Sequence, residues 1–149
     1  MDQQPAPPPP NEHDLVQPAM LAAIAVGGAL GGITRVALFF AVPAAAAGFP
    51  WATFWTNVAG SFTLGALVIV AAARVPSNHY VGPFLGTGFL GSFTTFSAFA
   101  AQASGLLDRG SVWTAASYAA GTLGVGLLAA WMGIALARRA VRGTSWTGS

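Results

Sequence analysis

The chain has 149 residues, of which 54% are apolar and only 7% are charged. Soluble domains carry about 25% charged residues, so this chain has too few charges to cover a water-facing surface. Its net charge of +2 comes from arginines without lysine and offers no basic face for a nucleic-acid backbone. The absence of cysteine excludes disulfides, thiolate metal sites and a cysteine nucleophile.

Residues 1–18 are rich in proline and polar side chains and hold three of the four acids, Asp2, Glu12 and Asp14. This segment has too few apolar side chains to bury a core, which predicts a disordered N-terminal tail. It also lacks the basic start and small-residue cleavage site of a signal peptide. We therefore expect the first apolar segment to stay in the protein.

Four apolar stretches follow, each as long as the roughly 20 residues that a helix needs to cross a bilayer. They predict an all-α integral membrane domain over residues 19–138, followed by a short C-terminal tail at 139–149. The expected spans are Met20–Val42, Trp51–Ala73, Gly82–Leu107 and Val112–Ala137.

The arginines predict an orientation. An even number of spans places both termini on one side, where Arg74, Arg138, Arg139 and Arg142 also lie, whereas Arg109 lies on the other side. The positive-inside rule then favours cytoplasmic termini.

Glycines at four-residue spacing predict close helix packing. Gly27, Gly28, Gly31 and Gly32 form two overlapping G-x-x-x-G pairs in the first span, and residues 82 and 86 form another in the third. Small residues allow backbones to approach in lipid, so we expect these glycines to pack helices and bind nothing.

In the second span Thr53, Asn57 and Ser61 follow at intervals of four and share one helical face. Polar residues within a span are expensive unless they are partnered. This stripe has two interpretations: it bonds to neighbouring helices, or it lines a path for something that needs hydrogen-bond donors. From this helix alone the packing interpretation is favoured.

The third span predicts a broken helix. Gly86, Gly88 and Gly91 are followed by Ser92 and the pair Thr94–Thr95, a poor sequence for a continuous helix. Non-helical backbone at membrane depth is tolerated where it is buried in protein or lines a cavity, and broken helices are frequent ion sites. Freed carbonyls would suit a cation, and freed N–H groups an anion.

Three motifs in order resemble the Fluc (CrcB) family of fluoride channels. They are G-G-x-x-G-x-x-x-R at Gly27 to Arg35, F-P-x-x-T-x-x-x-N-x-x-G-S-F-x-x-G at Phe49 to Gly65, and G-F-x-G-x-x-T-T-F-S-x-F at Gly88 to Phe99. The resemblance covers about residues 20–137. It implies a passive fluoride channel in a bacterial inner membrane that exports cytoplasmic fluoride and confers fluoride resistance.

The resemblance also implies an antiparallel, dual-topology dimer with two pores and a structural Na⁺ at its centre. Backbone carbonyls of Gly91 and Thr94 would bind that Na⁺. The implied pore residues supply an amide N–H, hydroxyl groups, two phenylalanine ring edges and a positive charge. They are Asn57, Thr95, Ser97, Phe96, Phe99, Thr53, Tyr118 and Arg35, with Thr122 as a weaker extension one turn beyond Tyr118. Arg35 has the alternative of snorkelling to the interface.

Two features depart from the family pattern. Ala98 stands where the family usually has threonine, which removes one hydroxyl beside the phenylalanine pair. The arginine bias is unlike that of a chain that inserts both ways equally, so the partner is either a second copy or an oppositely oriented paralogue.

Other classes fit the sequence less well. A four-helix drug or cation exporter needs a membrane carboxylate, yet no Asp or Glu falls inside any expected span. His13 and His79 lack the neighbours that catalysis needs, so we do not expect an enzyme. A non-transporting assembly subunit would explain the glycines but not the combination of Asn57, the break and the phenylalanine pair.

Overall fold

The computed structural model describes residues 17–42, 48–74 and 79–143. Every regular element within these ranges is a helix, and four helical stretches are long and apolar enough to cross a membrane. This confirms the predicted four-span membrane fold. Of the tail expected at 1–18, residues 1–16 lie outside the described residues, while Gln17 is the N-cap of α1 and Pro18 its first residue. The elements are α1 (Pro18–Ala41), α2 (Trp51–Arg74), a π-helical segment (Pro83–Leu90) that leads into α3 (Gly91–Phe93), α4 (Phe96–Asp108) and α5 (Val112–Gly143).

Helix α5 is longer than the sequence predicted. It continues to Gly143, six residues past the expected end at Ala137, so residues 139–143 are helical and do not belong to a tail. Alanine and arginine are both strong helix formers, and no proline or glycine interrupts 138–142. The arginines end the apolar run and thus mark the end of the membrane segment, but they do not end the helix.

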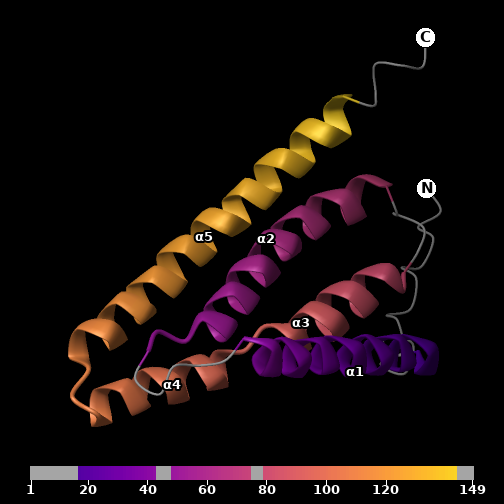
Figure 1. The fold of residues 1–149 in the computed structure, drawn as a ribbon. Coiled ribbons are helices and arrows are strands. Elements are labelled where there is room, and N and C mark those ends of the chain that lie inside the picture. The colour runs from indigo at the N-terminus through magenta and orange to yellow at the C-terminus, as the bar shows by residue number, and fades with distance from the viewer. Residues whose placement is uncertain (1–16, 43–47, 75–78, 144–149) are drawn as a thin grey trace, which may run out of the picture.

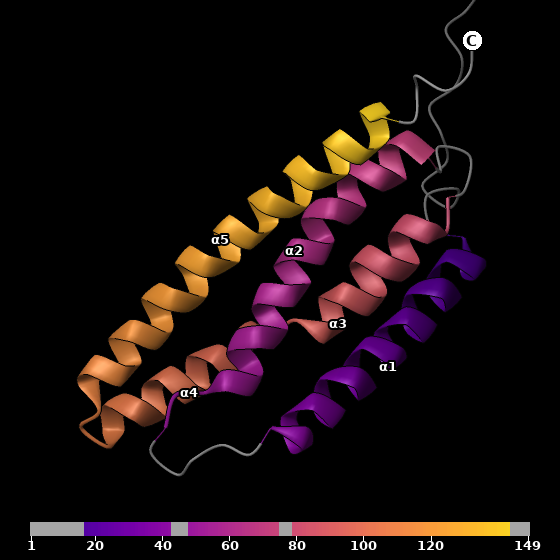
Figure 2. The same ribbon diagram turned by 45° about the horizontal axis from the view of Figure 1, so that its top comes forward.

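The helices form two neighbouring pairs (Figure 2). Helix α2 packs along α5, and α1 packs along the π-helical segment and α3. Helix α4 joins α5 through a tight turn in which Gly110 adopts a φ of 73°, a conformation that suits glycine. The first residue of α1 and the last residue of α5 lie at the same end of the bundle, opposite the α4–α5 turn (Figure 1).

Backbone-to-backbone contact at glycine holds each pair together. A Cβ atom at Gly27 or Gly31 of α1 would collide with the carbonyl oxygens of Phe84 or Phe89, respectively. In the other pair, Gly65 and Gly133 lie just as close to backbone of the facing helix. These contacts confirm packing by the pair Gly27 and Gly31, as expected where no hydrophobic drive brings helices together in lipid. The overlapping pair Gly28 and Gly32 does not pack in the same way, because nothing lies within 4 Å of a Cβ placed on Gly32.

The expected glycine pair of the third span is not the one that packs. Nothing lies within 4 Å of a Cβ placed on Gly82, and Gly86 would meet only the end of the Leu67 side chain at 3.8 Å. Gly88 makes the close contact instead, since its Cβ would lie 2.6 Å from the Ile24 carbonyl oxygen. The π-helical turn shifts which residues face α1, and the regular spacing of 82 and 86 therefore misled the prediction.

Adjacent glycines of α1 provide a matched test of this packing. We expect Gly31→Ala to destabilise the protein by about 1–3 kcal/mol, because its methyl group overlaps the Phe89 carbonyl. Gly32→Ala has nothing within 4 Å and should leave stability unchanged. Thermal unfolding in detergent, followed by loss of the monodisperse chromatographic peak, measures both. Equal unfolding temperatures for the two variants would contradict this account.

Candidate functional site

The third span is interrupted at Thr94 and Thr95. Thr94 has a ψ of 157°, and Thr95 has φ −151° and ψ 121°, so both are extended. The Leu90 carbonyl is the last helical acceptor, and it receives both the N–H of Thr94 at 3.0 Å and its hydroxyl at 2.9 Å. Helix α4 then restarts with the Thr95 hydroxyl as its N-cap, accepting from the Ala98 N–H at 3.2 Å. The predicted break is confirmed, and threonine hydroxyls stabilise both of its ends.

Asn57 of α2 holds this break by two hydrogen bonds to one residue. Its Oδ1 accepts from the Thr95 N–H at 2.9 Å, and its Nδ2 donates to the Thr95 carbonyl at 3.1 Å. A primary amide has two N–H groups. One N–H of Asn57 therefore fixes the backbone, and the other takes no part in this contact.

A cavity of about 290 Å³ opens beside the break. It brings together α2, the extended residues, α4 and α5. Its lining contains amide and hydroxyl groups, two phenylalanine rings and apolar residues of α5: Asn57, Ser61, Thr94, Thr95, Phe96, Phe99, Thr122, Leu123, Gly126 and Leu127. We call it the break cavity.

Thr122 is the donor of the break cavity that stands out. Its Oγ1 is buried and has no hydrogen-bond partner among the described residues. Buried polar groups are nearly always paired in folded proteins, because an unpaired one loses its hydration without compensation. Thr122 lines the break cavity, but its hydroxyl oxygen itself is buried. Its spacing of four from Tyr118 was the only signal in the sequence.

The predicted phenylalanine pair meets at the edge of the break cavity. The rings of Phe96 and Phe99 lie 5.7 Å apart at 41°. Phe96 is 76% exposed, which leaves its ring on the outer surface of the chain. Phe99 is partly buried and contacts the Tyr118 ring at 5.2 Å.

Tyr118 supports the cavity but does not line it. It is fully buried, meets the Phe49 ring edge to face and the Phe99 ring at a tilt of 46°, and donates its hydroxyl to Gln102 Oε1 at 2.9 Å. The structure therefore places it behind Phe99, whereas Thr122 lines the cavity. The sequence analysis did not single out Gln102, because its tie to Tyr118 joins two helices and leaves no spacing pattern.

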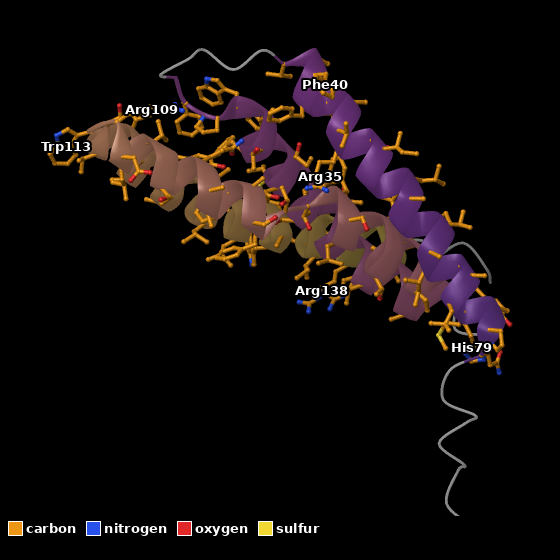
Figure 3. The ribbon with its side chains drawn as sticks, turned by 90° about the horizontal axis from the view of Figure 1, so that it is seen from below. Arg35, Phe40, His79, Arg109, Trp113 and Arg138 are labelled. Atoms are coloured by element: carbon orange, nitrogen blue, oxygen red, sulfur yellow. The ribbon has the colours of Figure 1, made fainter. Side chains whose placement is uncertain are left out.

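Arg35 and Thr53 lie at a second cavity, of about 280 Å³, between α1, α2 and α4. Its lining residues are Arg35, Val36, Phe39, Phe40, Ala52, Thr53, Thr56, Thr95 and Ala98. We call it the arginine cavity. Figure 3 shows Arg35 turned from α1 toward the neighbouring helices, and its Nε is buried without a partner among the described residues. Thr53 thus faces away from the break cavity that Asn57 and Ser61 share, and Thr95 borders both cavities.

The remaining predicted residues also lie at the break. The Ser97 hydroxyl is exposed and lies 3.2 Å from the Thr95 hydroxyl, outside the lining of the break cavity. Gly91 and Thr94 share a smaller cavity of about 180 Å³. Because the Thr95 N–H goes to Asn57, the Gly91 carbonyl loses the donor that a continuous helix would supply. Backbone oxygens of this kind suit a hard cation such as Na⁺.

The described residues contain no cluster of His, Cys, Asp or Glu that could hold a metal ion. Their one acidic residue, Asp108, closes α4 at the end of the bundle, far along the helix from the break. Fold and site together define a multi-pass helical membrane protein with a broken third span, whose central cavities offer hydrogen-bond donors and no carboxylate.

Comparison with known proteins assigns the family. Residues 22–134 match the family model described as CrcB-like protein, Camphor Resistance (CrcB). The chain therefore belongs to the CrcB family. Two relatives in Streptomyces avermitilis are named fluoride-specific ion channel FluC 2 and FluC 3, and each is 43% identical to this chain. A third, fluoride-specific ion channel FluC of Agrobacterium fabrum, is 39% identical.

The matches differ in how much of each protein they cover. The FluC 2 match covers 72% of this chain and 68% of that protein, and the FluC 3 match covers 82% and 60%. The Agrobacterium match covers 79% of this chain and 95% of that protein. All of these relatives are bacterial, in keeping with a multi-pass protein of a bacterial membrane.

Proposed function

We propose that this chain forms a passive, fluoride-selective channel that lets fluoride leave the cytoplasm. The observation that carries the proposal is the break cavity, whose lining holds amide and hydroxyl groups and no acidic residue, and in which the Thr122 hydroxyl has no partner among the described residues. The names of the relatives supply the identity of the ion.

Fluoride is small and strongly hydrated, so a pore must replace its water with donors. The second N–H of Asn57 and the hydroxyls of Thr122 and Ser61 are such donors within one cavity. The rings of Phe96 and Phe99 add the positive edges of their quadrupoles. Thr95 and Ser97 contribute hydroxyls at the rim, and Arg35 raises the local potential from the far side of Thr95 without lining the break cavity.

The cavity chemistry argues for passive transport of an anion. A proton-coupled exporter exchanges protons for its substrate at a carboxylate within the membrane, whereas the one carboxylate of the described residues, Asp108, is the last residue of α4 and lines none of the described cavities. In a non-transporting assembly subunit, a Thr122 hydroxyl without a partner among the described residues and the Asn57 amide would have no reason to line the same cavity. Anion conduction accounts for both groups.

Pore closure calls for a second chain. In a single chain the break cavity and the 76% exposed Phe96 ring would face hydrocarbon, which neither a polar path nor a hydrated anion tolerates. An antiparallel dimer places a second copy of this surface, or a related one, against the first. The same arrangement would complete a central Na⁺ site from the Gly91 and Thr94 carbonyls of both chains. When bound, Na⁺ would supply the positive charge that holds these carbonyls together across the interface.

Fluoride efflux from liposomes tests the channel. The complete antiparallel dimer, reconstituted with K⁺ fluoride inside, should release fluoride to an external electrode only when valinomycin lets K⁺ carry the compensating charge. Chloride-loaded liposomes should release no chloride under the same conditions. Efflux that proceeds without valinomycin, or chloride release at a similar rate, would refute a passive fluoride-selective channel.

The arginine distribution predicts which dimer forms. Arg138, Arg139 and Arg142 lie at the end of α5 on the side of the termini, opposite Arg109. This asymmetry fixes one orientation, so the antiparallel partner is an oppositely oriented paralogue. The occurrence of two related proteins, FluC 2 and FluC 3, in Streptomyces avermitilis supports the presence of paralogues in one bacterium.

We expect the chain expressed alone to insert with its C-terminus in the cytoplasm in nearly every copy. Replacing the three α5 arginines by glutamine should yield a mixture of both orientations. A C-terminal reporter active on one side only, measured in parallel with a reporter for the opposite side, gives the ratio. A wild-type chain that inserts equally both ways and conducts fluoride alone would establish the homodimer instead.

A further inference from the structure

Gly60 of α2 leaves a space that Thr94 fills. Gly60 is buried, and a Cβ atom placed on it would collide with the Cγ2 methyl group of Thr94. The Thr94 methyl group therefore occupies the position that a side chain at residue 60 would take. This contact is separate from the packing of α2 on α5, for which Gly65 and Gly133 provide the close backbone contacts. Gly60 thus meets the broken third span and not the neighbouring long helix.

The Thr94 side chain is held in the rotamer that points its methyl group at Gly60. Its hydroxyl donates to the Leu90 carbonyl at 2.9 Å. Threonine carries both groups on Cβ, so a rotation that withdrew the methyl group from Gly60 would also withdraw the hydroxyl from Leu90. A larger residue at position 60 must therefore break this hydrogen bond or displace the backbone of the break.

Asn57 and Gly60 hold two successive residues of the break. They are three residues apart on α2, a spacing at which two residues are neighbours on the helix surface. Asn57 binds the backbone of Thr95 through hydrogen bonds of 2.9 and 3.1 Å, whereas Gly60 receives the side chain of Thr94 by shape alone. Contacts at two points fix the orientation of the extended residues as well as their position.

The position of Thr94 matters for two cavities. Thr94 lines the break cavity, and it also lines the smaller cavity of about 180 Å³ together with Gly60 and Gly91. We infer that Gly60 is a positioning residue of the channel, which admits the Thr94 methyl group and so keeps the Thr95 backbone on the Asn57 amide. This role rests on the proposed channel function, because that amide is one of the donors proposed for fluoride.

Hydrogen–deuterium exchange at the Thr95 amide tests this role without reference to flux. This chain is labelled with ¹⁵N-threonine within the complete dimer and followed by NMR in detergent, where Thr95→Ser identifies the resonance. We expect Gly60→Ala to accelerate exchange at Thr95 at least tenfold more than at Thr56, inside α2, because only the break opens locally.

Gly65→Ala is the matched control on the same helix. Its methyl group would collide with the Ala130 carbonyl of α5 instead of the break, so it should accelerate exchange at Thr56 and Thr95 to the same extent, through a general loss of stability. Equal acceleration at both amides by Gly60→Ala as well would reduce Gly60 to ordinary helix packing and overturn the proposal.

A second substitution tests whether the Thr94 methyl group carries the effect. Thr94→Ser removes this methyl group and keeps a hydroxyl for Leu90, so in its presence Gly60→Ala should accelerate Thr95 exchange less than twofold. Gly60→Ala should slow fluoride efflux at least fivefold when Thr94 is intact, and by a smaller factor relative to Thr94→Ser alone. The same acceleration of exchange on both backgrounds would refute a contact through the methyl group.

The same pair of variants covers a failure to fold. If Gly60→Ala alone gives no folded dimer, recovery of the dimer by Thr94→Ser supports the contact, and no recovery overturns it. A Thr95 amide that responds as expected in a dimer that conducts no fluoride would leave the positioning role of Gly60 standing and refute the channel instead.

Discussion

Replacing Asn57 by aspartate is expected to reduce fluoride efflux at least a hundredfold. The carboxylate can still accept from the Thr95 N–H, but it has no hydrogen to donate to the Thr95 carbonyl, which now faces a negative oxygen. It also places a negative charge on the break cavity, where the chain otherwise has neutral donors. Like charges at close range in a low-dielectric site repel strongly, so fluoride is excluded. Electrode-monitored efflux from liposomes with valinomycin measures the loss.

Two further variants separate the roles of Asn57. Asn57→Leu removes both hydrogen bonds and the donor without adding charge, and we expect it to be inactive and less stable. Thr63→Val alters an exposed hydroxyl of the same helix that bonds only to the Ala59 carbonyl, and it should conduct normally. An active Asn57→Leu would mean that the amide neither holds the break nor meets the ion.

Structural features that depend on residues close in sequence could be predicted, whereas features that depend on residues distant in sequence could not. Hydropathy sets each span locally, and glycines with hydroxyl residues weaken a helix locally, so the four helices and the break at Thr94–Thr95 could be predicted. The end of α5 could not, because the arginines that close an apolar run are themselves good helix formers. A periodic pattern also assumes a regular helix, and the π-helical turn made Gly88 pack where Gly82 and Gly86 were expected to.

The candidate site also combines features set by local sequence with features set by contacts between distant residues. Thr53, Asn57 and Ser61 share a helical face, yet Thr53 lines one cavity and Asn57 and Ser61 line another, with Thr95 at the border of both. Only the packing of helices distant in sequence could reveal this division. The grip of Asn57 on Thr95 spans 38 residues, so no local pattern encodes it. These two hydrogen bonds give Asn57 a structural role in addition to the proposed role of its second N–H as a donor to the ion. The two interpretations of the polar stripe are therefore both present in one side chain.

Thr122→Val is expected to separate conduction from stability. Valine has nearly the same shape as threonine, and the Thr122 hydroxyl is buried without a partner among the described residues, so its removal breaks no protein hydrogen bond. Removing an unpaired buried polar group relieves a desolvation penalty of about 1–3 kcal/mol. We therefore expect an unfolding temperature equal to or above that of the wild type, together with at least tenfold slower fluoride efflux.

Thr56→Val serves as the matched control on α2. The Thr56 hydroxyl is engaged with the Ala52 carbonyl at 2.7 Å and does not line the break cavity, so efflux should be nearly unchanged. A hydroxyl that only packed helices would show the opposite pattern at Thr122, with stability lost and conduction kept. A hydroxyl that binds the ion should instead lower the stability of the protein without fluoride and raise the rate of fluoride efflux. Its lack of a protein partner is then the property that lets it replace water around the anion.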